Sequence, residues 1–201
     1  MSNAVHARFI EIASDLSPAL HEAVQAVGPV SFARRNESPF PEYLARAVAG
    51  QQLSVKAARA IWGRVEQACS AAPLVEALCE SQAVTLRECG LSNAKVKTLC
   101  AIGAAARSGE LDGQALRALS PEERSDSLTQ LWGVGRWTAD MANMFWFGEE
   151  DIWPDGDVAA RKTLEKLTSA RRKTHRTALR FAPYRSYLAL YMWQWVDAKP
   201  Q

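Results

Sequence analysis

The sequence predicts an all-α protein, and three observations lead to this fold class. Apolar residues recur at three- and four-residue steps in the segment 43–69 and again in "SYLALYMWQWV" at 186–196. Segments with the strict alternation typical of strands are nearly absent. Breaks rich in Pro, Gly and Ser, at 37–43, 71–74, 89–92, 111–114 and 119–123, predict about nine or ten short helices.

Length and composition favour a compact protein without a membrane partner. The chain has 201 residues, of which 48% are hydrophobic, enough for one core or for two lobes that share one. Its apolar runs stay well below the roughly 18 to 20 residues that cross a bilayer. The N-terminus lacks the basic start and apolar core of a secretion signal. We therefore expect a cytoplasmic protein.

The cysteines and histidines give no metal-binding pattern. The cysteines are spaced by 10, 10 and 11 positions, which matches neither the close pairs of zinc sites nor the runs that hold iron–sulfur clusters: Cys69, Cys79, Cys89 and Cys100. We expect reduced core cysteines and no cluster. The histidines are scattered and are expected at the surface or in packing contacts: His6, His21 and His175.

Charge is distributed unevenly along the chain. Residues 161–185 hold nine Lys or Arg and one Glu, whereas the whole chain has a net charge of only +2. Such a segment is either a solvated helical face with a basic loop or a surface that meets phosphates. Both interpretations stay open at this point.

A helical hairpin is predicted at 119–147. Ser120 is placed as an N-cap before Pro121, and this helix should run to about Leu131. Gly133 and Gly135 then bracket a turn that we expect to be too tight for side chains, and "RWTADMANMFWF" resumes the helical pattern. Such a turn can present backbone N–H groups to a DNA phosphate, although an ordinary hairpin with a glycine cap has the same pattern.

Four segments carry a family resemblance. The hairpin "LWGVGRWTADM" followed by "WPDGDVAARK" resembles the helix-hairpin-helix (HhH-GPD) DNA glycosylases, whose hairpin precedes a Gly- and Pro-rich loop ending in a catalytic aspartate. The other segments resemble the alkylpurine branch, DNA-3-methyladenine glycosylase II: "PFPEYLARAVAGQQLSVKAA", "GLSNAKVKTL" and "FAPYRSYLALYMWQW". In order, they cover residues 39–195.

The resemblance implies an all-α, two-lobed HhH-GPD fold with a DNA-facing central cleft. Too few residues precede Ser38 for the N-terminal β domain of some members. A single glycosylase unit over 1–201 would comprise a central helical lobe, 41–150, and a second lobe built from 1–40 and 151–201. The resemblance further implies a monomer.

The catalytic acid is expected at Asp157. Cleavage of a base from its sugar passes through an oxocarbenium-like state, which a fixed carboxylate stabilises while it orients or deprotonates the attacking water. The family spacing from Pro154 to "VAARK" selects Asp157, which would also cap a helix starting at Val158. Asp155 is the alternative, because relatives with a shorter loop place the acid nearer the proline.

The resemblance assigns a base pocket and a chemistry. In lyase members, a lysine that forms a Schiff base stands two residues after the second hairpin glycine, and this chain has Trp137 there. Hydrolysis without lyase activity is therefore expected. Trp137, Met141 and Trp193 would line the pocket for the flipped base, where indoles attract a cationic alkylated purine. Core packing is the alternative for Trp193.

The resemblance also assigns DNA and ion contacts. Gln52, in the turn "GQQLS", would fill the gap left by the flipped nucleotide, and Leu53 is expected in the core. Backbone carbonyls of the hairpin would hold a monovalent cation, Na⁺ or K⁺, with a structural role: Thr129, Leu131 and Val134. No cofactor is expected to be required. The hairpin residues expected to bind DNA are Gly133, Val134, Gly135, Arg136 and Thr138.

Together these features predict a monofunctional glycosylase of base excision repair. Its substrates would be alkylated purines of the 3-methyladenine and 7-methylguanine type in double-stranded DNA. The alternative is a helix-hairpin-helix DNA-binding module without chemistry, which needs neither the acid nor the pocket aromatics. Pocket shape decides the choice among the modified purines.

Overall fold

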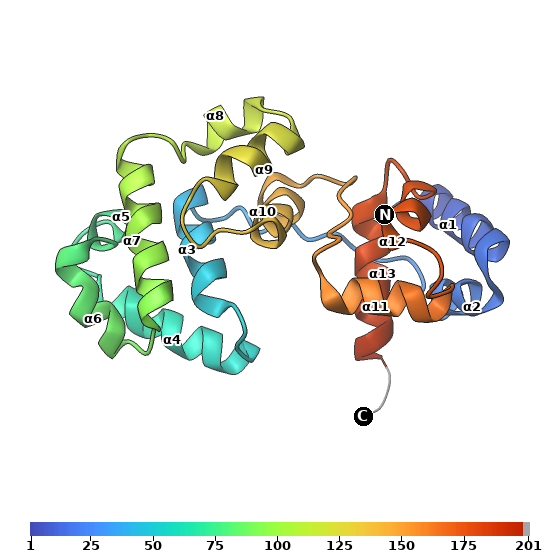
Figure 1. The fold of residues 1–201 in the computed structure, drawn as a ribbon, viewed down its shortest axis with the longest axis horizontal. Helices are drawn as coiled ribbons and strands as arrows, with labels where there is room; N and C mark the ends of the chain where they lie inside the picture. The colour runs from blue at the N-terminus through green and yellow to red at the C-terminus, as the bar shows by residue number, and fades with distance from the viewer. Residues whose placement is uncertain (199–201) are drawn as a thin grey trace. The chain divides into compact units, whose positions relative to one another are not determined.

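The computed structural model describes residues 1–198, which fold into helices and connecting segments without a β-strand. The all-α prediction is confirmed. Within these residues, no helix combines the length and apolar character needed to cross a bilayer. The chain forms two compact units (Figure 1): the continuous unit, Arg35–Phe147, and the split unit, made of residues 1–34 and 148–198. The lobes expected at 41–150 and at 1–40 with 151–201 stay a prediction about the working enzyme.

The continuous unit contains the predicted hairpin and a set of helices that pack around it. Several helices begin at serine or aspartate N-caps, as Ser54 and Ser92 do, because the side-chain oxygen accepts an otherwise unpaired N–H of the first turn. The elements are α3 (Phe40–Gly50), α4 (Val55–Ala68), α5 (Leu74–Ala77), η1 (Glu80–Gln82), α6 (Ala83–Glu88), α7 (Asn93–Arg107), α8 (Gly113–Ala118), α9 (Pro121–Thr129), α10 (Arg136–Ala142) and the π-helical η2 (Asn143–Phe147).

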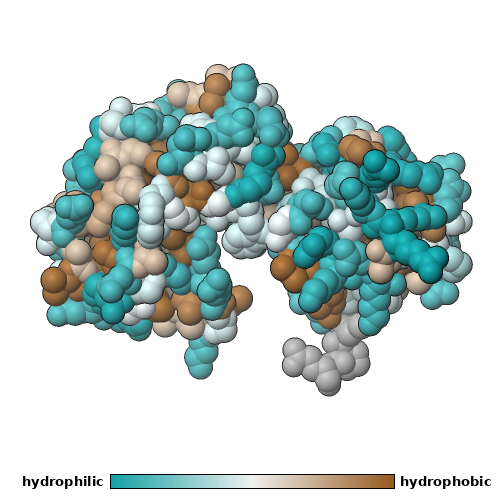
Figure 2. Space-filling view, in the orientation of Figure 1, coloured by the Kyte–Doolittle hydropathy of each residue, from teal (hydrophilic) through white to brown (hydrophobic). Residues whose placement is uncertain are grey.

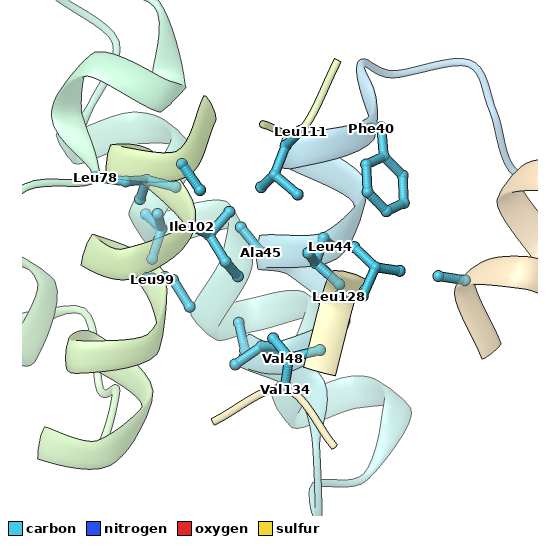
Figure 3. Packing of buried hydrophobic residues seen from close by; sticks show 14 of the residues in the cluster. Phe40, Leu44, Ala45, Val48, Leu78, Leu99, Ile102, Leu111, Leu128 and Val134 are labelled. Carbon is cyan, nitrogen blue, oxygen red and sulfur yellow. The ribbon is translucent and has the colours of Figure 1, made fainter. Parts of the chain in front are cut away.

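The core of the continuous unit lies between α3 and α7 and extends to the hairpin. Figure 3 shows Leu99 and Ile102 of α7 directed toward the apolar face of α3, which carries Leu44 and Val48. Val134, from the hairpin turn, joins the same cluster. Burial of these side chains is the main source of stability for helices this short, because short helices are marginal in isolation.

Two sets of polar contacts stabilise the hairpin. Ser120 and Glu123 form a capping box at the start of α9, as the sequence predicts. Buried Arg124 donates to the carbonyls of Leu116 and Leu119, both at 2.9 Å, and to Asn143 Oδ1 at 2.7 Å. Its guanidinium also lies 3.8 Å from the centroid of the Phe147 ring. The network ties α9 to η2.

The first hairpin helix ends earlier than expected. We expect it to reach about Leu131, whereas α9 ends at Thr129. The N–H groups of Gln130 and Leu131 bond to carbonyls three residues back, at Ser127 and Leu128, so the last turn tightens before the chain reverses.

The split unit joins the two ends of the described chain. Phe9 contacts Phe181 and Tyr191, with ring centroids 4.9 Å and 5.4 Å apart, so an aromatic cluster links its N- and C-terminal segments. Helix α11 packs against α13 and α2. The helices are α1 (Asn3–Leu16), α2 (Pro18–Val27), α11 (Val158–Leu167), α12 (Thr174–Leu179) and α13 (Arg185–Asp197).

The cysteines differ from one another in burial. All four are free thiols, and Cys69 and Cys89 are buried as expected. The expectation of core cysteines is wrong for Cys79 and Cys100, which are half-buried. Both line a surface hollow beside α7, where Cys100 also packs against the edge of the core.

Candidate active site and DNA interface

Asp157 is the N-cap of α11, as the sequence predicts. Its Oδ1 accepts the Ala160 N–H at 2.8 Å and the Trp193 Nε1–H at 3.0 Å. Its own N–H donates to the carbonyl of Pro154 at 2.8 Å, which closes the loop onto the helix. The half-buried carboxylate is therefore held from the backbone and from α13. A carboxylate fixed in this way can stabilise a developing positive charge without reorganising.

Asp155, the alternative acid, has a different environment. Its Oδ1 accepts the Thr174 hydroxyl at 3.0 Å and the indole N–H of Trp153 at 3.2 Å. Trp153 is buried and precedes Asp155 in the loop, whereas Thr174 begins α12. These contacts support a structural role for Asp155 in joining the loop to α12.

Trp193 lies at the edge of the buried stripe of α13. Residues 186–192 of this helix are buried, while Trp193 is half-buried. The hydrogen bond from Trp193 to Asp157 was not expected from the sequence, which predicts stacking or packing for this indole. Both the acid and this tryptophan belong to the split unit.

The hairpin turn of the continuous unit is tight at one glycine and open at the other. Gly133 has φ +81°, and a Cβ there would lie 2.1 Å from Thr98 Oγ1. At Gly135, with φ −93°, a Cβ would meet nothing within 4 Å. The expectation that both positions are too tight for side chains is therefore wrong for Gly135. Val134 between them is buried, so its side chain faces the core.

Two other hairpin residues have their side chains engaged within the protein. Arg136 binds both carboxylate oxygens of Glu122, at 2.9 Å and 2.8 Å, and its Nε donates to Asp140 at 3.0 Å. The ion pair lowers the pKa of the Glu122 carboxyl. Thr138 is buried, and its hydroxyl accepts Nε2–H of Gln51 at 2.9 Å. DNA contacts at Arg136 and Thr138, which stay a prediction, would be made by the backbone if these bonds persist.

Trp137 and Met141 share one face of α10. They are four residues apart, which places them one above the other on a helix. Trp137 is 39% exposed, and Met141 is half-buried. The Met141 carbonyl accepts the Tyr43 hydroxyl at 3.3 Å, and burial raises the pKa of Tyr43 to about 12, so this phenol stays a donor. The arrangement of Trp137 and Met141 on this face suits one wall of an aromatic pocket.

The turn between α3 and α4 carries strain at Gln52. This residue has φ +57°, in the left-handed region that residues other than glycine seldom adopt, and its side chain is exposed. Leu53 is 38% exposed, so the expectation that it lies in the core is wrong. The reason is that α3 ends at Gly50 and α4 starts at Val55, which leaves Leu53 off the apolar stripe of either helix.

Lys95 holds this turn in place. Its Nζ donates to the carbonyls of Ala49 at 2.9 Å and Gln51 at 2.7 Å. The carbonyls at a helix C-terminus lack intrahelical partners and carry partial negative charge, which explains the position of the ammonium. Burial lowers the pKa of Lys95. Sequence reasoning missed this residue, although it stands in the quoted segment "GLSNAKVKTL".

The carbonyls expected to hold a cation lie where α9 ends. Terminal carbonyls of a helix attract positive charge, and an all-oxygen set suits a hard cation such as Na⁺ or K⁺. The Leu131 carbonyl accepts the Val134 N–H at 3.0 Å, but a carbonyl has a second lone pair. Among residues 1–198, no cluster of His, Cys, Asp or Glu offers another metal site. The carbonyl oxygens of Thr129, Leu131 and Val134 are suitable ligands for such an ion, whose presence stays a prediction.

Comparison with known proteins adds independent information. The family model "HhH-GPD superfamily base excision DNA repair protein" matches residues 45–182. A relative described as DNA-3-methyladenine glycosylase 1 of Schizosaccharomyces pombe is 33% identical over 180 residues, which cover 85% of this chain and 79% of the relative.

Solved structures agree along almost the whole chain. A 3-methyladenine DNA glycosylase of Schizosaccharomyces pombe in complex with abasic DNA has a TM-score of 0.77 and 28% identity, with 96% of each chain covered. A DNA-3-methyladenine glycosidase of Bacillus halodurans has a TM-score of 0.78 and 29% identity, over 96% of this chain and 89% of the other. Both the predicted fold class and the predicted family are thus confirmed.

Proposed function

Because the chain belongs to the HhH-GPD superfamily of base excision DNA repair proteins, we propose that it is a DNA glycosylase for alkylated purines in duplex DNA. The reaction is hydrolysis of the bond between the sugar C1′ and the purine nitrogen. Two similar proteins, from Schizosaccharomyces pombe and Bacillus halodurans, are described as acting on 3-methyladenine, and the first is bound to abasic DNA, the product of such a reaction.

The observation that carries the proposal is the fixed carboxylate of Asp157. As the C1′–N bond breaks, its electrons leave with the purine and positive charge develops on the sugar. Asp157 stabilises this charge and orients the water that attacks C1′, and it accepts a proton from that water. The bonds from Ala160 and Trp193 to Oδ1 support this role, because they hold the group in one orientation.

The pocket residues give the proposed selectivity. The target nucleotide must leave the base stack before Asp157 can act, and Gln52, exposed on the strained turn, would occupy the gap. A purine alkylated at a ring nitrogen is cationic and leaves as a neutral base. Stacking on Trp137 or Trp193 would favour it by roughly 0.5–2 kcal/mol per contact through cation–π attraction.

The proposed chemistry stops at base release. Lyase activity in this superfamily needs an amine that forms a Schiff base with the sugar, and the corresponding residue here is Trp137. An indole nitrogen is not a nucleophile of this kind. The product would be an intact strand with an abasic site.

A base-release assay tests the function directly. Duplexes would each contain one 3-methyladenine, 7-methylguanine, 1-methyladenine, hypoxanthine or ethenoadenine, and the free base would be measured by mass spectrometry. We expect release of the alkylated purines, strand cleavage only after hot alkali, and no covalent adduct trapped by borohydride. Binding without release from any duplex would favour the DNA-binding module instead. A borohydride adduct would contradict only the proposal that the enzyme has no lyase activity.

A further inference from the structure

A polar hollow of about 390 Å³ lies within the split unit, beside α11 and lined by residues from Asp155 to His175. We call it the basic hollow. It is formed by one side of α11, the segment that follows, and the start of α12. In Figure 2 the visible surface over this segment is mainly hydrophilic. Four cationic side chains and two carboxylates line it: Arg161, Arg171, Arg172, Lys173, Asp155 and Glu165.

Arg161 gives the strongest indication that the basic hollow binds an anion. Its Nε is buried and has no hydrogen-bond partner, and within residues 1–198 it is the only buried side-chain nitrogen or oxygen in this condition. A buried donor of a charged group costs free energy when it stays unpaired. Arg161 lines the basic hollow, so an anion bound there is a candidate acceptor for this donor.

The two carboxylates do not cancel the positive charge of the basic hollow. Asp155 already accepts hydrogen bonds from Thr174 and Trp153. Glu165 stands four residues after Arg161 on α11 and offsets one cation. Arg171, Arg172 and Lys173 are exposed at the rim, where they can close on a ligand. Several guanidinium groups around a polar hollow match the oxygens of a phosphate group.

The position of Arg161 relative to Asp157 identifies the source of the phosphate. The backbone N–H of Arg161 bonds to the Asp157 carbonyl, so the two residues are one helical turn apart, about 6 Å along the axis. A sugar held against Asp157 therefore brings the backbone of its own strand close to this helix. We infer that the basic hollow binds one backbone phosphate of the DNA near the damaged nucleotide, a contact separate from those of the hairpin. The inference rests on the proposed function.

Salt dependence of DNA binding tests the inference. We would compare Arg161→Gln, the double variant Arg171→Gln/Arg172→Gln and their combination on an undamaged labelled duplex. Each lost phosphate contact lowers the slope of log K against log salt by about 0.9. If all three arginines share one phosphate, the combined variant should lose about 0.9 of the slope in total, and not about 0.9 for each arginine removed. The matched control is Lys166→Gln/Arg176→Gln, which removes two exposed charges outside the basic hollow and should leave the slope unchanged.

Neutralising single phosphates in the DNA locates the contact. A methylphosphonate would be placed at one backbone position at a time. We expect one position near the lesion where the wild type loses affinity and Arg161→Gln does not. Identical profiles for the two proteins, or slope losses that add across the variants, would overturn the inference. Arg161→Lys should keep the slope and lose affinity, because an ammonium keeps the charge but not the fork of donors.

Two further measurements distinguish a DNA phosphate from free phosphate, and the phosphate site from the proposed function. Inorganic phosphate, tested alone by thermal shift, would overturn the DNA assignment if it stabilised the wild type but not Arg161→Gln while the salt slopes stayed equal. Base release at low salt would be measured on the same proteins. If the wild type released no base but the slope and methylphosphonate results held, the proposed function would fail and the phosphate site would stand. Unfolding temperatures check each variant, and the double variant lies at exposed positions where folding is not at risk.

Discussion

The indole nitrogen of Trp193 donates a hydrogen bond of 3.0 Å to the same carboxylate oxygen of Asp157 that accepts the Ala160 N–H. One side chain is thus tied to both the proposed acid and the proposed pocket. A tryptophan in this position can orient the carboxylate and still offer its ring face to a base. Separating the two roles requires a substitution that removes the donor and keeps an aromatic ring.

Trp193→Phe makes this separation. Loss of a hydrogen bond to a charged group costs about 1.5–3 kcal/mol, so we expect turnover to fall by about tenfold to a hundredfold. Binding to a duplex with an abasic-site analogue should stay near the wild-type value, because the ring remains. Single-turnover rates and fluorescence anisotropy would measure the two effects. Unchanged turnover would mean that backbone capping alone orients Asp157.

Asp157→Asn should affect base release, whereas Asp155→Asn should affect stability. We expect Asp157→Asn to lose about 10²- to 10⁴-fold in base release while DNA binding survives, because the variant also removes a negative charge. Asparagine is a good N-cap, so α11 should remain folded. Asp155→Asn should keep activity and lower the unfolding temperature, since its carboxylate joins the loop to α12. Single-turnover base release would compare them, and an inactive Asp155→Asn beside an active Asp157→Asn would reverse the assignment.

Gly135→Ala and Gly133→Ala form a matched pair for the hairpin. A Cβ at Gly135 meets nothing within 4 Å, so the fold should tolerate it, whereas a Cβ at Gly133 clashes with Thr98 at a positive φ. We expect Gly133→Ala to cost about 1–3 kcal/mol of stability. Gly135→Ala should keep its unfolding temperature but weaken DNA binding by about tenfold, because the methyl group separates the backbone N–H from a phosphate. Wild-type affinity in Gly135→Ala would argue against a backbone–phosphate contact there.

Lys95→Met should uncouple the turn at Gln52 from α7. The variant keeps the length of the side chain but removes two hydrogen bonds to carbonyls at the end of α3. We expect a loss of about 1–3 kcal/mol in stability and a larger loss in base release than in binding to undamaged DNA. Lys97→Met is the control on the same helix, since its exposed cation–π contact with Trp132 is worth only about 0.5–1 kcal/mol. Equal effects of the two variants would show that Lys95 does not position the turn.

Trp137→Ala should change selectivity among substrates. No group that would protonate the leaving base is evident in the sequence, so cationic 3-methyladenine or 7-methylguanine should be released faster than neutral hypoxanthine or ethenoadenine. If the indole attracts positive charge, Trp137→Ala should slow release of the cationic bases more. Competition between two duplexes in one reaction would measure the ratio. Equal losses on charged and neutral bases would reduce the indole to a shape or packing role.

The sequence predicted the features that depend on local rules. Ser120 and Asp157 cap their helices, and the hairpin follows from Pro121 and the two glycines, because capping and turn geometry are set by residues close in sequence. Family spacing singled out Asp157 as the catalytic acid, and that role stays a prediction.

Features that depend on distant contacts could not be predicted in the same way. The bond between Trp193 and Asp157 spans 36 positions, and the bonds of Lys95 to Ala49 and Gln51 span more than 40. Leu53 was misjudged because its apolar character fits a helical stripe, whereas the structure ends α3 just before it. Gly135 was misjudged because tightness depends on distant neighbours: Thr98 crowds Gly133, whereas no atom crowds Gly135, and a sequence pattern does not reveal this difference.

The split unit also constrains the order in which the chain becomes functional during synthesis. Residues 35–147 are contiguous, so the hairpin and its core have all their partners once this stretch has left the ribosome. Helices α1 and α2 precede this stretch, yet the partners of Phe9, at Phe181 and Tyr191, follow it in the sequence and are made later. Asp157 likewise receives its bond from Trp193 only after residue 193 has been made. A nascent chain would therefore complete the helical hairpin before the carboxylate of Asp157 is oriented.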